Sequence, residues 1–264
     1  MAKENQNRIY RNTNACETVI GISQNWQFKS IMNTEHIKVW DVVLETNREY
    51  APNAIFSFPK KQIKTFSVGY VRLKRTMDIL GAINGLILTF PVSILLAISI
   101  KLTSKGGVFY SQERVGKQGR IFQIYKFRSM VENAEPNGPK LATSFDSRIT
   151  RIGRFMRRFK LDEIPNFANV LKGDMALVGY RPERPYYIEQ IKSFTMEYHQ
   201  LLQIKPGITS IGQTRFGYAS TVEQMVQRLK FDLEYLKTMS ISTDIAILFR
   251  TILCIVNGND RKSS

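Results

Sequence analysis

The 264-residue sequence has few of the residues that build metal centres and disulfide frameworks. Its two cysteines, Cys16 and Cys254, and its two histidines, His36 and His199, exclude a disulfide scaffold, a cysteine-based zinc module and a histidine-rich metal site. Acidic residues are also scarce, since 22 Asp and Glu stand against 38 Lys and Arg and give a formal net charge of +16. This excess indicates an anionic partner, namely nucleic acid, a lipid surface or a phosphorylated substrate.

The positive charge is concentrated in one part of the chain. Between Lys101 and Lys160 there are 14 basic and 4 acidic residues, so this stretch carries +10 of the +16. It directly follows the most apolar stretch of the sequence. The hydrophobic content of 43% excludes a wholly disordered or low-complexity chain, so the basic stretch belongs to a folded protein.

The apolar stretch is long enough to enter a membrane. Residues 79–100 contain no charged side chain, and as one straight helix they would be roughly 33 Å long. Lysines and arginines flank both ends, which favours the cytoplasmic side for both. Pro91 near the middle predicts a kink. The hydroxyls of Thr89 and Ser93 could bond to the carbonyls that this kink frees.

Basic flanks and a central proline together predict a re-entrant helical hairpin at about residues 76–102. Such a hairpin would dip into one leaflet and return to the cytoplasmic face. A simple membrane span stays open, because proline also occurs in spanning helices. A buried helix of a soluble protein is the third alternative. The first 25 residues are polar, so we expect no export signal.

The remaining sequence predicts an α+β fold that is mainly helical. Residues 1–69 form an N-terminal extension of unknown role, with β-like runs at 18–22, 37–44 and 54–58, and residues 70–264 form the second domain. Short strands on both sides of Gly116 and Gly119 predict a β-hairpin. Helices are expected at 150–158, from 162 to a stop at Gly173, at 184–198, at 223–237, and from Thr243 or Asp244 to Val256. The last of these could lie at a membrane interface.

The richest chemistry follows the hairpin. Six cations lead into the adjacent carboxylates Asp162 and Glu163: Arg148, Arg151, Arg154, Arg157, Arg158 and Lys160. Arginine forks match phosphate oxygens, and a carboxylate beside several cations stays ionised at neutral pH. Such a carboxylate can attack phosphorus or bind Mg²⁺. A solvated or lipid-facing basic surface explains the arginines equally well.

Several motifs occur in one order along residues 70–258. They are KRTMDIL (74–80), an apolar helix with a central proline, QERVG (112–116), YKFRSM (125–130), RITRIGRFMRR (148–158), LDEIPN (161–166), NVLKGDMALVG (169–179), RPE (181–183) and KPGIT (205–209). This set resembles the bacterial sugar transferases of the monotopic polyprenyl-phosphate phosphoglycosyl transferase superfamily. The resemblance covers roughly three quarters of the chain.

The resemblance implies an activity and a set of site residues. In that family an aspartate attacks the β-phosphate of a UDP-sugar, UMP leaves, and undecaprenyl phosphate then accepts the sugar phosphate. The nucleophile falls on Asp162, and Glu163 is the second acid, with both carboxylates as the expected Mg²⁺ ligands. The phosphate-binding arginines fall on Arg157 and Arg181, although Tyr180 replaces a proline of the family motif. Further candidates for the diphosphate are Lys126 and Arg128.

The resemblance also implies where the protein acts. The expected location is the cytoplasmic face of the bacterial inner membrane, at the first membrane step of a cell-surface glycan pathway. The expected partners are a UDP-sugar, undecaprenyl phosphate and membrane lipid, without nucleic acid, and a homodimer is kept open. Arg114 could serve in a structural salt bridge or contact substrate. The alternative function is a non-enzymatic basic protein that binds membrane or nucleic acid.

Overall fold

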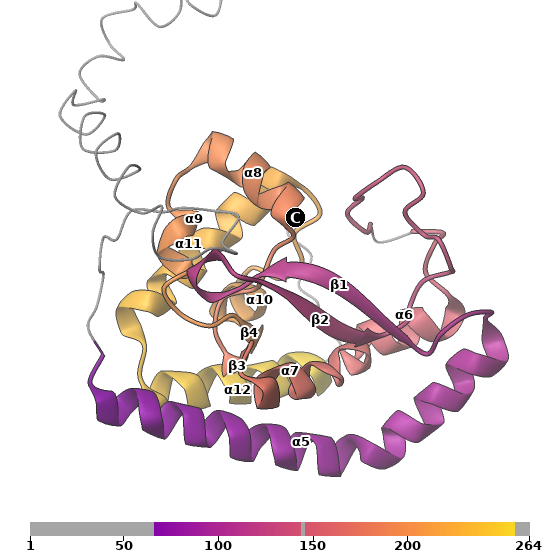
Figure 1. Cartoon of the computed structure of the whole chain (residues 1–264), viewed down its shortest axis with the longest axis horizontal. Coiled ribbons are helices and arrows are strands. Elements are labelled where there is room, and N and C mark those ends of the chain that lie inside the picture. The colour runs from indigo at the N-terminus through magenta and orange to yellow at the C-terminus, as the bar shows by residue number, and fades with distance from the viewer. Residues whose placement is uncertain (1–65, 144–145, 257–264) are drawn as a thin grey trace, which may run out of the picture. The chain divides into compact units, whose positions relative to one another are not determined.

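The computed structural model describes residues 66–143 and 146–256 of the chain. The β-like runs expected at 18–22, 37–44 and 54–58 lie outside these residues, and so do His36 and Cys16. The described part is α+β, as predicted, and helices dominate it. Figure 1 shows the long helix α5 (Val68–Thr103) along one side, with α7 (Asn166–Lys172) and α12 (Ile241–Val256) beside it and a strand pair above α7.

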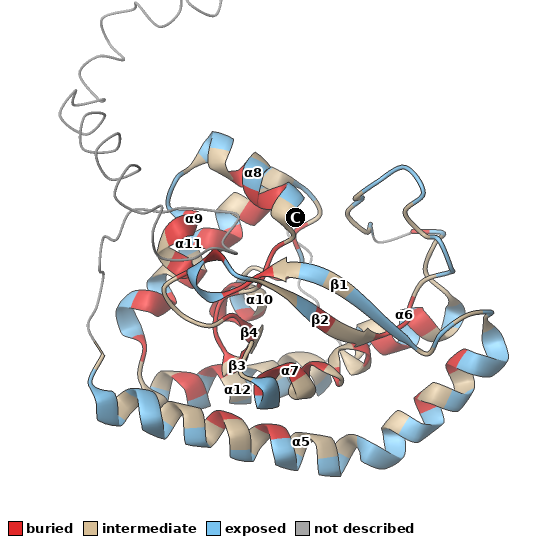
Figure 2. Ribbon diagram, viewed as in Figure 1, coloured by how far each residue is buried: buried red, intermediate tan, exposed pale blue. Residues whose placement is uncertain are grey.

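The long helix α5 (Val68–Thr103) contains the whole apolar stretch. By length and composition it is the one helix of the described residues that could cross a membrane, and only 11% of its most apolar window is buried. Figure 2 shows exposed residues along most of its length. A helix so little covered by protein differs from the core helix of a soluble protein, which buries its apolar surface.

The helix α5 is unbroken through Pro91. Figure 1 shows that its two ends run in different directions. Proline removes the helical donor to the carbonyl of Ile87. The hydroxyls of Thr89 and Ser93 instead bond to the carbonyls of Gly85 and Thr89, at 2.6 and 2.9 Å, so the expectation that they satisfy the freed carbonyl was wrong. Such bonds to the preceding turn also bend helices. A re-entrant path with a kink at Pro91 stays a prediction.

The N-terminal half of α5 packs closely on the rest of the fold. A methyl group at Gly81 would lie 2.4 Å from Leu177, and one at Gly85 would lie 2.6 Å from Phe167. Side chains at these two positions would push the helix away, so the glycines permit the contact. One apolar cluster behind this contact joins α5 to later elements through Ala82, Ile124, Val170 and Met175.

Buried polar groups fix the start of α5. The ammonium of Lys74 lies 2.6 Å from Asp244 and donates to the carbonyl of Val178. Asp244 also accepts a hydrogen bond from the hydroxyl of Tyr235 at 2.6 Å, and Asp78 accepts one from the backbone N–H of Leu177 at 2.9 Å. The KRTMDIL motif therefore ties the apolar helix to two segments that lie about 100 or more residues later in the chain, at Leu177 and Val178 and at Asp244.

The predicted hairpin forms as two antiparallel strands, β1 (Phe109–Val115) and β2 (Ile121–Phe127), joined by a turn of 3-10 helix at Lys117–Gly119. The helix α6 (Arg151–Arg158) follows, with the hydroxyl of Thr150 accepting from the N–H of Gly153 as an N-cap. A second apolar cluster joins the C-terminal end of α5 to these elements through Leu96, Ile100, Phe127, Met156 and Ile164.

The helix expected from Asp162 begins later than predicted. Leu161–Glu163 form a 3-10 turn, and α7 covers Asn166–Lys172. Pro165 therefore precedes the helix rather than occupying its first turn. Gly173, with φ of 94°, ends it as expected. The short strands β3 (Ala176–Val178) and β4 (Gly207–Thr209) then pair in parallel and bring the NVLKGDMALVG and KPGIT motifs together.

Of the C-terminal helices, α8, α9 and α11 lie on the side of the fold away from α5, whereas α12 lies beside α5 (Figure 1). The single helix expected at 184–198 is divided into α8 (Pro185–Phe194) and α9 (Tyr198–Leu201). The next helices are α10 (Ile211–Arg215) and α11 (Val222–Thr238), which confirms the amphipathic helix predicted at 223–237. The last helix, α12 (Ile241–Val256), begins before Thr243, whose N–H bonds to the hydroxyl of Ser240.

Candidate active site

The two adjacent carboxylates lie in the short turn between α6 and α7. Lys160 adopts a left-handed conformation with φ of 55°, which reverses the chain after α6 and leads into the 3-10 turn. Asp162 is only 6% exposed. Burial of ionisable groups is costly unless cations or hydrogen bonds compensate. The surroundings of this dyad therefore decide what its two carboxylates can do.

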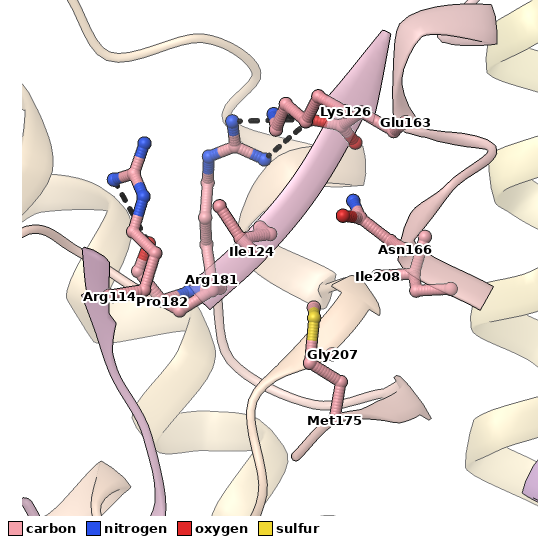
Figure 3. A pocket seen from close by; sticks show the side chains of 10 residues that line it. All are labelled: Arg114, Ile124, Lys126, Glu163, Asn166, Met175, Arg181, Pro182, Gly207 and Ile208. Carbon is pink, nitrogen blue, oxygen red and sulfur yellow. Dashed lines mark hydrogen bonds and ion pairs between the residues drawn. The ribbon is translucent and has the colours of Figure 1, made fainter. Parts of the chain in front are cut away.

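Glu163 is held by two cations from different parts of the chain. The ammonium of Lys126, on β2, lies 2.5 Å from Oε1 of Glu163, and the guanidinium of Arg181 approaches the same oxygen at 3.5 Å. Figure 3 shows both cations converging on this carboxylate. Burial on its own raises the pKa of Glu163, but Lys126 and Arg181 hold that pKa well below its ordinary value. Glu163 is therefore ionised and fixed in place.

Asp162 is in a different state from its neighbour. Among the described residues, its carboxylate forms no hydrogen bond or ion pair. Burial raises the pKa of Asp162, the charge of Glu163 adds to the rise, and nearby Lys126 and Arg157 lower it. An unbonded carboxylate oxygen beside cations keeps its lone pairs available for reaction. The dyad thus contains one anchored carboxylate and one that is free to react.

Arg157 is positioned by a close contact between α6 and the end of the hairpin. A methyl group at Gly153 would lie 1.9 Å from the carbonyl oxygen of Ser129, so only glycine permits this approach. The Nε of Arg157 donates to the hydroxyl of Ser129 at 2.8 Å. Arg157 lies five positions before Asp162, and the turn at Lys160 brings it close enough to lower the pKa of the carboxylate.

Arg128 lies apart from the dyad. Its guanidinium donates to the carbonyl of Lys105 at 2.5 Å, and to the carbonyl and hydroxyl of Ser104 at 3.0 and 2.8 Å. It therefore caps the C-terminal end of α5, where free carbonyls attract a cation. The structure thus brings together Glu163, Lys126 and Arg181, with Arg157 near Asp162, but not Arg128. Phosphate binding by any of these residues stays a prediction.

A buried network behind the site supports Arg181. Oδ2 of Asp232, on α11, lies 3.5 Å from the backbone N–H of Arg181, and Oδ1 accepts from the N–H of Gly212 at 2.9 Å. Glu183 forms ion pairs with Arg228 and, at 3.7 Å, with Arg114. The sequence reasoning missed Asp232 because a single acid on an amphipathic helix carries no signal of its own. For Arg114, the structure shows the salt bridge.

Tyr180 fits the position that the family motif gives to proline. It is fully buried, its ring packs edge-on against that of Tyr198, and its backbone forms a parallel bridge with Pro206. The loop that carries Arg181 is therefore continuous with the β3–β4 pair. Its geometry depends on a buried aromatic side chain rather than on a proline ring.

The carboxylates fit a magnesium site that substrate would complete. Among the described residues, no group of three or more His, Cys, Asp or Glu side chains could hold a metal. Mg²⁺ is commonly bound by one or two carboxylates together with substrate phosphates and water. Asp162 and Glu163 provide such a pair, although Lys126 and Arg181 already neutralise Glu163 through Oε1.

The fold and the site define an α+β protein with one exposed apolar helix and a buried carboxylate–cation cluster beside it. The chain belongs to the bacterial sugar transferases: the model of that family matches residues 69–258. This confirms the family that the sequence motifs indicated.

Three relatives show how far the similarity extends. The UDP-N-acetylgalactosamine-undecaprenyl-phosphate N-acetylgalactosaminephosphotransferase of Aeromonas hydrophila is 41% identical over 72% of this chain and 45% of its own length. The UDP-glucose:undecaprenyl-phosphate glucose-1-phosphate transferase of Escherichia coli is 40% identical, over 68% and 39%. The galactosyl transferase CpsE of Streptococcus agalactiae is 33% identical, over 90% and 56%. The chain thus spans about half the length of these relatives or less.

Proposed function

We propose that this protein transfers a sugar 1-phosphate from a UDP-sugar to undecaprenyl phosphate. Membership of the bacterial sugar transferases supports this activity, and two relatives are named as undecaprenyl-phosphate sugar phosphate transferases. The relatives differ in sugar, with N-acetylgalactosamine, glucose and galactose among them, so the sugar stays open. Family membership argues against the alternative of a non-enzymatic basic binding protein.

The proposed chemistry takes place in two displacements at one phosphorus atom. A carboxylate oxygen of Asp162 attacks the β-phosphorus, the bond from that phosphorus to the bridging oxygen breaks, and UMP leaves with the bond electrons. The sugar phosphate is then esterified to Asp162. An oxygen of undecaprenyl phosphate next attacks the same phosphorus, and the bond to Asp162 breaks. The carboxylate is regenerated, and the product is a polyprenyl-diphosphate-linked sugar.

The unbonded state of Asp162 is the observation that carries this assignment. Its neighbour Glu163 is fixed by Lys126 and Arg181, so Asp162 is the carboxylate of the dyad that can form a new bond. Phosphoryl transfer depends chiefly on positioning and on neutralising charge. Arg157 and Arg181 would bind phosphate oxygens. Asp162 and Glu163 would hold Mg²⁺, which neutralises diphosphate charge when it is bound.

The exposed apolar surfaces would place this site at a membrane. The proposed path takes α5 into the cytoplasmic leaflet and back, with a bend at Pro91. The helix α12 would lie on the same interface through exposed apolar side chains, namely Ile245, Phe249, Ile252, Leu253 and Val256. A soluble sugar nucleotide and a lipid phosphate could then reach Asp162 from the same side.

The test is UMP release by purified protein in lipid nanodiscs, with Mg²⁺ and a panel of UDP-sugars. Without undecaprenyl phosphate, we expect at most one UMP per protein and a phospho-sugar on Asp162 in the intact mass. Asp162→Asn should abolish both. Asp174→Asn, which removes a carboxylate outside the cluster, is the matched control. Near-normal UMP release by Asp162→Asn would refute the assignment.

A further inference from the structure

A small pocket lies directly behind the cation–carboxylate cluster. It encloses about 240 Å³, part of which is open to solvent. Figure 3 shows Lys126, Glu163 and Arg181 along one side. The other side is mostly apolar and includes Ile124, Met175 and Ile208.

A buried amide without a partner faces this pocket. Asn166 is 1% exposed, and Figure 3 shows its carboxamide extending from the start of α7 toward the centre of the pocket. Its Oδ1 has no hydrogen-bond partner among the described residues. Buried polar atoms in folded proteins nearly always have one, because an unpaired acceptor keeps the full cost of its desolvation. Oδ1 therefore lacks a donor that something else must supply.

Asn169 shows what a structural asparagine does on the same helix. It is fully buried, its amide donates to the carbonyl of Gln123 at 2.7 Å, and its oxygen accepts from the N–H of Tyr125 at 3.1 Å. Both bonds fasten α7 to β2. One turn of α7 thus carries two buried asparagines: one is satisfied by the protein, and the other points its acceptor into the pocket.

We infer that Asn166 accepts a hydrogen bond from the sugar of the donor substrate, from a ring hydroxyl or an amide N–H. This inference rests on the proposed function. The cations Lys126 and Arg181 at the same pocket match the diphosphate. The group joined to the β-phosphate is the sugar, so the sugar reaches the space behind these cations first. The apolar wall of the pocket suits the C–H face of a sugar ring.

The first experiment compares the two asparagines by substitution with leucine, which has a similar size and no polar atoms. Asn166→Leu should keep or raise the melting temperature, because it removes an unpaired acceptor. It should also lower kcat/KM for sugar-phosphate transfer by about 10- to 100-fold. Asn169→Leu should instead lower the melting temperature, because it breaks two bonds to β2. Unchanged kcat/KM in Asn166→Leu would overturn the inference and leave a bound water as the partner.

The second experiment compares ratios of kcat/KM within each protein, so the result does not depend on how much of a variant is folded. UDP-sugars that lack one hydroxyl at a time are compared with the parent sugar. One position should reduce kcat/KM at least tenfold in the wild type and have little effect in Asn166→Leu. Equal sensitivity of the two proteins at every position would contradict a contact between Asn166 and the sugar.

Inhibition by UMP distinguishes a contact with the sugar from a contact with the nucleotide. UMP should inhibit the wild type and Asn166→Leu with the same Ki, because it carries no sugar to be displaced. A Ki raised tenfold in Asn166→Leu would place the contact on the nucleotide and refute this inference. If the wild type releases UMP from no UDP-sugar, the proposed function fails. If it is active but the leucine variant behaves identically, only the inference fails.

Discussion

Arg128 offers a direct test of the difference between a phosphate ligand and a structural cap. The sequence places it two residues after Lys126 in the YKFRSM motif, and the family resemblance makes both residues candidates for binding the diphosphate. The structure gives its guanidinium three hydrogen bonds to Ser104 and Lys105, at 2.5 to 3.0 Å, and leaves it 8% exposed. We therefore expect Arg128→Ala to damage stability rather than chemistry.

The magnitude follows from the number and kind of these bonds. Each hydrogen bond from a charged donor contributes about 1.5–3 kcal/mol, and water replaces part of what is lost. A loss of about 3–5 kcal/mol in the free energy of unfolding is therefore expected. In a domain of this size, each kcal/mol shifts the melting temperature by about 2–4 °C. Arg128→Ala should thus melt roughly 10 °C below the wild type.

The assay measures thermal unfolding and UMP release on the same nanodisc preparation. Activity is determined well below the melting temperature and normalised to folded protein, and it should stay within about threefold of the wild type. Arg154→Ala, an exposed arginine on α6, is the control for loss of charge and should melt within about 2 °C of the wild type. An unchanged melting temperature with a 100-fold loss of activity would show that Arg128 binds phosphate.

Two further substitutions test residues that hold the site residues in position. Burial raises the pKa of Asp232 to about 6, so its contribution to stability is present below about pH 4 and lost as the pH rises through 6. As the pH rises from 4.5 to 7.5, Asp232→Asn should therefore gain up to about 3 kcal/mol in the free energy of unfolding relative to the wild type. Chemical unfolding at both pH values measures this difference between the two proteins, and a difference that is equal at both would contradict the prediction. Gly153→Ala should displace α6 from Ser129 and cost about 1–3 kcal/mol together with most of the activity, whereas Gly69→Ala, which has open space around it, should change neither. An active and stable Gly153→Ala protein would show that α6 can move without harm.

The sequence predicted best where the signal is local. Glycines between two apolar runs predicted the β1–β2 hairpin, and the spacing of apolar residues predicted α11 almost to its ends. Thr150 before an amphipathic run gave the start of α6, because a capping hydroxyl acts within four residues. In each case the interactions that stabilise the element lie within the segment that was read.

Sequence patterns gave less where distant segments decide the structure. The motif gave Lys126 and Arg128 as candidates for one role, but the side chain of Arg128 bonds to the carbonyls of Ser104 and Lys105, more than 20 residues earlier. The extra turn expected at the start of α7 is lost because Asp162 and Glu163 lie in a 3-10 turn instead. Asn166 was inside a recognised motif, one turn after the dyad. Only the folded structure shows that both polar atoms of Asn169 are hydrogen-bonded and that Oδ1 of Asn166 is not.

The charge of the cluster explains why the two acids of the dyad differ. Lys126, Arg157 and Arg181 provide three positive charges near the two carboxylates of the dyad. The cluster therefore holds an excess of positive charge in a buried place, which is unfavourable without an anion. A diphosphate supplies that anion. Because Glu163 keeps two of the cations fixed, the site does not have to rearrange when the phosphates arrive, and Asp162 meets phosphorus in a setting that is already arranged.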